Sequence, residues 1–167
     1  MSSFTLKELP RASLDAALAK AAHYRDLNQP EEAESICLDV LDVEPGHVKA
    51  WKLLGLAITD RFPSGQVGLL EQAIHAFEKL PDPYERTYHL GVAWERAAKA
   101  HVEKNESHSA VAAFEHALAL FEKAERMRPD LPDPILRWNR CVRLLISHPP
   151  LRAASLAPRE DEVHLGD

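Results

Sequence analysis

The chain has 167 residues, of which 46% are hydrophobic, and a formal net charge of −6. This length suits one compact domain or a short stack of repeats, and the hydrophobic content is enough for a continuous core. The negative charge argues against nucleic acid as the main partner, because phosphate binding depends on clustered lysine and arginine. Charges interrupt every hydrophobic segment well before the roughly 18 residues needed to span a bilayer, so we expect no membrane insertion.

The only two cysteines, Cys37 and Cys141, are too few and too far apart for a disulfide scaffold or a C-x-x-C motif. We interpret both as buried thiols in a reducing compartment. The first residues also lack the apolar stretch of a signal peptide. These features predict a cytoplasmic protein.

The spacing of apolar residues is helical between nearly all glycine and proline positions, which predicts an all-α fold. Prolines with acidic neighbours, as at Asp82-Pro83 and Asp133-Pro134, mark helix starts. Beyond Pro150 the periodicity is lost. Seven helices are predicted, at about residues 13–27, 30–44, 47–60, a fourth ending at 80, 82–104, 109–127 and 133–147.

A three-residue pattern recurs on every second predicted helix. It consists of a small residue, a second residue four positions later and a third residue three positions after that. It occupies Ala33, Cys37 and Val40, then Ala73, Phe77 and Leu80, then Ala117, Phe121 and Ala124. The preceding helices carry small residues at Ala21, Gly55 and Gly91. Small residues are needed where two antiparallel helices cross closely, so we expect Ala21, Gly55 and Gly91 to lie at these crossings.

This pattern resembles the tetratricopeptide repeat (TPR) family. The resemblance implies a right-handed superhelical stack of antiparallel helix pairs, a TPR-like α-solenoid. It divides the chain into an N-terminal extension (1–12), a repeat domain (13–147) and a flexible C-terminal tail (148–167). Within the domain, the repeats span about 14–47, 48–83 and 84–131, and residues 134–147 form a capping helix.

The second and third repeats are longer than the first. The small residues of each pair are 12, 18 and 26 positions apart, so these repeats carry 6 and 14 extra residues. Fourteen residues add about two turns to each helix of the third pair. We expect this third hairpin to overhang the stack as a further contact surface.

In TPR proteins the first helix of each repeat lines a concave groove that binds a partner polypeptide. The resemblance, with three arginines of the capping helix continuing the lining, implies a mixed apolar and basic groove suited to an acidic or carboxylate-ending peptide. A merely solvated face is the alternative. The clamp that binds chaperone tails is missing, because Leu18, Ala22 and Leu53 occupy positions where it needs polar side chains. The predicted groove residues are Leu18, Arg25, Lys49, Lys52, Leu56, Tyr88, His89, Val92, Glu95, Arg96, Arg137 and Arg140.

The predicted function is therefore that of a non-catalytic scaffold, adaptor or dedicated assembly chaperone for another protein, with no cofactor and no metal. The sequence has no nucleophile elbow, phosphate-binding glycine loop or H-E-x-x-H motif. Two alternatives stay open. One is a self-assembling structural protein, and the other is a small-molecule or metal-binding regulatory module that uses His101, His108 and His116 near the long hairpin.

Overall fold

The computed structural model describes residues 4–158, and within them all regular secondary structure is helical, as predicted. No strand occurs in this range. Asp82 caps α5 by accepting a hydrogen bond from the backbone N–H of Glu85 at 3.1 Å. The helices are α1 (Leu14–Asp26), α2 (Pro30–Val43), α3 (Val48–Asp60), α4 (Leu69–Glu78), α5 (Pro83–Glu103), α6 (Ser107–Met127), α7 (Asp133–Ser147) and α8 (Pro149–Leu156), with short 3₁₀ segments η1 (Arg11–Ser13) and η2 (Phe62–Ser64).

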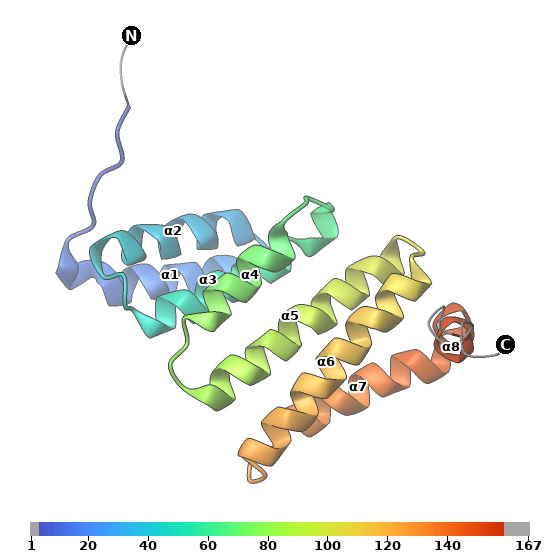
Figure 1. Cartoon of the computed structure of the whole chain (residues 1–167). Coiled ribbons are helices and arrows are strands. Elements are labelled where there is room, and N and C mark those ends of the chain that lie inside the picture. The colour runs from blue at the N-terminus through green and yellow to red at the C-terminus, as the bar shows by residue number, and fades with distance from the viewer. Residues whose placement is uncertain (1–3, 159–167) are drawn as a thin grey trace, which may run out of the picture.

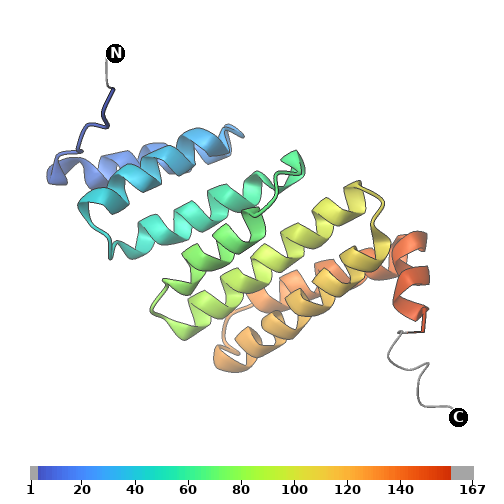
Figure 2. The same ribbon diagram turned by 45° about the horizontal axis from the view of Figure 1, so that its top comes forward.

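Helices α1 to α7 follow one another in a row of antiparallel neighbours, and α8 lies crosswise at the end of α7 (Figures 1 and 2). Each helix packs on the next one in the chain, and α3 also contacts both α1 and α5. Helices α1 and α2 lie at one end of the row, and α7 and α8 lie at the other. Two distant faces of the molecule are thus formed by the first and last helices.

The repeating residues form the seams between paired helices, as predicted. All nine second-helix positions of the pattern are at most 1% exposed. The ring of Phe121 on α6 lies against the backbone of Gly91 on α5, where a Cβ atom would come within 2.7 Å of it. Phe77 on α4 occupies the same position over Gly55 on α3, and an added Cβ would overlap its ring. Glycine is therefore required for the observed spacing of both helix pairs.

The buried side chains form two clusters that meet at α5. One cluster joins α1 to α4 and includes Ala93 and Ala97 of α5. The other joins α6, α7 and α8 to α5 through Val92 and Ala98. Burial raises the pKa of the Cys37 and Cys141 thiols to about 12, one thiol in each cluster, so both are protonated and unreactive at neutral pH.

The third helix pair is long, as predicted, but its far end is flanked by other segments. Helices α5 and α6 have 21 residues each, and their added turns bring Ala98, Val102, Val111 and Phe114 into one cluster. Segment η2 packs against α5 on one side, and α8 packs against α6 on the other. The expected overhang is wrong for this reason.

Helix α8 corrects the expectation of a flexible tail from residue 148. Prolines lack the N–H that a first helical turn leaves unpaired, so Pro149 and Pro150 begin a helix instead of only ending one. Leu151 is fully buried and fixes α8 against α6 and α7. The rest of the expected tail, residues 159–167, lies outside the described residues.

The Gly91–Phe121 contact predicts a loss of stability on adding one methyl group. Gly91→Ala gains about 1 kcal/mol in helix propensity. It must nevertheless displace a buried ring, at a cost of about 1–3 kcal/mol. We expect a net decrease in the free energy of unfolding, measured by urea denaturation, that Phe121→Leu in the same chain partly reverses.

The control is Gly46→Ala, where an added Cβ has no neighbour within 4 Å and φ is not positive. It should leave stability within about 0.5 kcal/mol. Equal stability of Gly91→Ala and Gly46→Ala would contradict a role for the glycine in helix spacing.

Candidate functional site

The predicted groove residues divide into a buried and an exposed group. Leu18, Val92 and Glu95 are at most 1% exposed, and His89 is 8% exposed. These four cannot form an open binding surface, because α2 and α3 cover α1, and α6, Phe77 of α4 and Arg137 of α7 cover this part of α5. The accessible predicted residues are Arg25, Lys49, Lys52, Leu56, Tyr88, Arg96, Arg137 and Arg140.

Several accessible cations meet carboxylates from neighbouring helices. Arg25 of α1 donates from Nε to Oδ2 of Asp60 on α3 at 2.7 Å, and Arg96 of α5 pairs with the same carboxylate. Arg96 also donates to Oγ1 of Thr59 at 2.7 Å. A carboxylate in the last turn of a helix is unfavourable, because that end carries partial negative charge, and the two guanidinium groups offset this. Asp60 thereby joins three helices.

Glu95 forms the second ionic junction. Its side chain is 0% exposed, and it accepts hydrogen bonds from Lys99 at 2.6 Å and from Arg137 of α7 at 3.1 Å. Arg137 also donates from Nε to the Tyr88 hydroxyl at 3.3 Å. A buried carboxylate is tolerated only when it is paired and hydrogen-bonded, so these contacts tie α7 to α5.

A third junction surrounds His89. Its Nδ1 donates to the backbone carbonyl of Glu85 at 2.7 Å, and the Glu85 carboxylate accepts from Lys52 of α3 at 3.1 Å. The imidazole packs against the rings of Phe77 and Tyr88. Burial lowers the pKa of His89 below its ordinary value, and the Glu85 carbonyl only partly opposes this shift. The ring is therefore neutral at neutral pH.

These three junctions form an ionic band along α1, α3, α5 and α7, and we call this side of the molecule the first-helix face. It is defined by Arg25, Lys49, Lys52, Asp60, Glu85, Glu95, Arg96, Lys99 and Arg137, whereas Arg140 points away from it on the exposed side of α7. Sequence reasoning missed Asp60, Glu85 and Lys99. Two pairs have a sequence signal, Glu95 with Lys99 and Glu85 with His89, because their residues are four positions apart on one helix.

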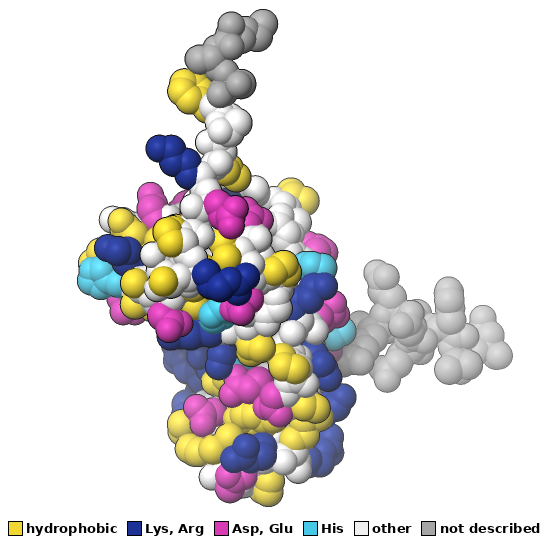
Figure 3. All heavy atoms as spheres, turned by 90° about the vertical axis from the view of Figure 1, so that its left-hand side faces the viewer, with side chains coloured by type: hydrophobic (Ala, Val, Ile, Leu, Met, Phe, Trp, Pro, Cys, Tyr) yellow, Lys and Arg dark blue, Asp and Glu magenta, His cyan; other side chains and the backbone are white. Residues whose placement is uncertain are grey.

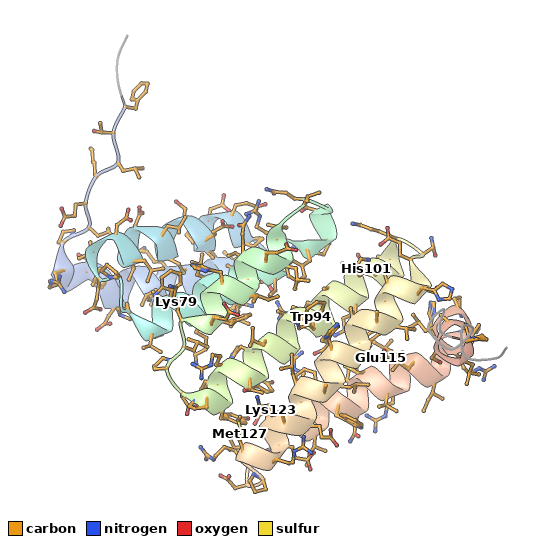
Figure 4. All side chains as sticks on the ribbon, viewed as in Figure 1. Lys79, Trp94, His101, Glu115, Lys123 and Met127 are labelled. Carbon is orange, nitrogen blue, oxygen red and sulfur yellow. The ribbon has the colours of Figure 1, made fainter. Side chains whose placement is uncertain are left out.

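The histidines named as an alternative site are separated. His101 lies at the far end of α5, well away from Trp94 (Figure 4), and its ring pairs with Glu106. His116 stacks on Trp94 with ring centroids 4.3 Å apart. Within residues 4–158, no three His, Cys, Asp or Glu side chains are placed to hold a metal ion.

No model of a known protein family matches the chain, and no curated protein matches its sequence. Among the described helices, none is both long and apolar enough to cross a membrane.

The buried position of Glu95 predicts that a conservative substitution there will strongly lower the stability of the fold. Glu95→Gln removes the charge that Lys99 and Arg137 share, and we expect it to lower the free energy of unfolding by about 2 kcal/mol. Chemical denaturation measures this. Glu103→Gln, on the exposed surface of the same helix, is the matched control and should change stability by less than about 0.5 kcal/mol. Two equal effects would show that Glu95 is not a junction.

His89 predicts a pH dependence of stability. Because its pKa is lower in the folded than in the unfolded chain, the unfolded chain binds more protons below about pH 6.5. Stability contributed by the neutral ring is present above that pH and decreases as pH falls through it. Denaturation between pH 7 and 5 should therefore show a steeper loss for the native chain than for His89→Gln. Parallel pH profiles would contradict this assignment.

Proposed function

We propose that the chain is a non-catalytic protein-interaction scaffold that binds an acidic, extended segment of a partner along the first-helix face. The observation that carries this proposal is the local charge of that face. It combines six lysine and arginine side chains with three carboxylates, on a chain whose net charge is −6. Such a local excess of positive charge attracts acidic segments.

The face also offers side chains for contact. Lys49 is exposed and has no carboxylate partner among the described residues, and the Lys52 side chain is 37% exposed. Leu56 and Tyr88 are partly exposed beside them. A bound segment would thus find two cations one helical turn apart, with apolar surface next to them.

The proposal includes a TPR-like, right-handed superhelical arrangement of the three helix pairs, α1–α2, α3–α4 and α5–α6. It is supported by the Gly55–Phe77 and Gly91–Phe121 contacts, which repeat at equivalent positions, and by the contacts of α3 with both α1 and α5. A rigid scaffold of this kind binds extended peptides without an ordering cost of its own. The two buried free thiols fit a cytoplasmic location.

Selection from a displayed library of short random peptides tests this function. Peptides enriched on the native chain should be rich in Asp and Glu. Lys49→Glu with Lys52→Glu should remove that enrichment, because the reversed charges repel acidic peptides while leaving the core intact.

Lys123→Glu serves as a control, since Lys123 is exposed on α6 (Figure 4), outside the first-helix face. Peptide selection by this variant should match that of the native chain. Undiminished acidic enrichment on the Lys49/Lys52 variant would exclude this face as the binding surface.

A further inference from the structure

Helix α7 presents an exposed face that no other described helix covers. Leu136 and Ile146 are 63% and 64% exposed, and Arg140 and Arg143 lie exposed between them. The opposite side of α7, around Cys141, packs on the second core cluster. Figure 3 shows hydrophobic and charged side chains side by side on the lower part of the molecule, where Figure 1 places the end of α6 and the start of α7. The face is apolar at both ends and basic in the middle.

Helix α2 presents the opposite charge at the other end of the row. Glu32 and Asp42 are exposed, Asp39 is partly exposed, and Leu38 between them is 48% exposed. A hollow of about 360 Å³ lies beside Asp39 and Asp42, and Leu6 of the N-terminal segment, itself 87% exposed, forms part of its wall. Lys7 and Arg11 also border the hollow, and Arg11 pairs with Glu44.

The charges of these two faces differ from those in the middle of the molecule. On the first-helix face, Arg25, Arg96 and Arg137 each contact a carboxylate. Neither Arg140 nor Arg143 has an ion-pair partner within residues 4–158. The same holds, within that range, for Glu32, Asp39 and Asp42. Exposed charges without an ion-pair partner also occur elsewhere in residues 4–158, as at Lys49 and Lys123, but those on α2 are all acidic and those between Leu136 and Ile146 on α7 are all basic.

We propose that the chain associates head to tail, with the α7 face of one copy packed on the α2 face of the next. Arg140 and Arg143 would pair with Asp39 and Asp42 of the second copy, and Leu136 and Ile146 would cover Leu38 and Leu6. The two faces cannot meet within one molecule, because they lie at opposite ends of the row (Figures 1 and 2). The contact joins two different surfaces, so it produces open chains or closed rings.

The size and charge of these faces determine how strong the contact is. One helix face against another buries less than the roughly 1,200 Å² of a stable interface. The association is therefore weak and depends on concentration. Exposed ion pairs are screened by salt, so it weakens as ionic strength rises.

Sedimentation of the full chain over a concentration series, up to about 1 mM, measures the association. The average mass of the native chain should rise with concentration and fall back when salt is added. An α7 variant, Arg140→Glu with Arg143→Glu, and an α2 variant, Asp39→Lys with Asp42→Lys, should each raise the dissociation constant about tenfold or more. All four substituted side chains lie on the surface, and circular dichroism checks that both variants stay folded.

Mixing the two variants distinguishes a head-to-tail contact from a symmetric one. The α7 variant keeps its α2 face and the α2 variant keeps its α7 face, so these two native faces can pair, and the two charge-reversed faces can pair as well. Each variant alone should stay largely monomeric, whereas an equimolar mixture should associate beyond the dimer, with the two variants alternating. A single chain with all four substitutions should associate again, because the charges are exchanged. Lys20→Glu with Lys123→Glu, an equal change of charge at exposed positions on α1 and α6, should leave the association unchanged.

Three results would overturn the proposal. The first is a constant monomer mass for the native chain at all concentrations. The second is association that neither charge-reversed variant weakens. The third is association that only one of the two variants weakens, which indicates a symmetric interface through the face altered in that variant.

Discussion

The close approach of a phenylalanine ring to a glycine backbone sets the spacing of the two central helix pairs. At Gly91 and Phe121, and again at Gly55 and Phe77, the ring fills the space that a side chain would otherwise occupy. Interiors are packed too tightly for such a ring to move without displacing its neighbours. The first pair has smaller residues, Ala21 and Cys37, at the equivalent positions, and both are fully buried. The helix axes of each pair are thus fixed by buried contacts, and the exposed faces can vary without disturbing the fold.

The difference between buried seams and exposed faces explains why the ionic contacts lie on the first helix of each pair. The patterned residues of the second helix in each pair are buried in the core. One side of α1, α3, α5 and α7 therefore remains for polar contacts between successive pairs. Asp60 joins α3 to α1 and α5, and Glu95 joins α5 to α7. A fully buried carboxylate such as Glu95 adds little net stability over an apolar residue, but leaving its charge unpaired is costly. The ionic band therefore favours one alignment of successive pairs over others.

The helices and seams could be predicted from the sequence because their signals are local. Asp82 and Pro83 mark the start of α5 by their chemistry alone, and the small residues at Gly55 and Gly91 follow a repeating pattern. The partners of Arg25 and Arg137 lie 35 and 42 residues away, and no local spacing predicts such a pairing. Helix α8 was missed for a different reason. Two prolines end the helix before them and can also begin the next one, and only the burial of Leu151 decides between the two.

A row of helices has a property that a closed globular core lacks, because each end of the row leaves helix faces on which no further helix packs. In the middle of the row, burial and pairing constrain most charges, as at Asp60 and Glu95. At the ends there is no next helix to select a charge partner, and the side chains of α2 and α7 are free of that constraint. Solvation alone would be satisfied by any mixture of charges there. Instead α2 carries Glu32, Asp39 and Asp42, and α7 carries Arg140 and Arg143, each set beside an exposed leucine. The two end faces thus carry opposite charges, and both have exposed apolar side chains. This arrangement allows the α7 end of one copy to pack on the α2 end of another.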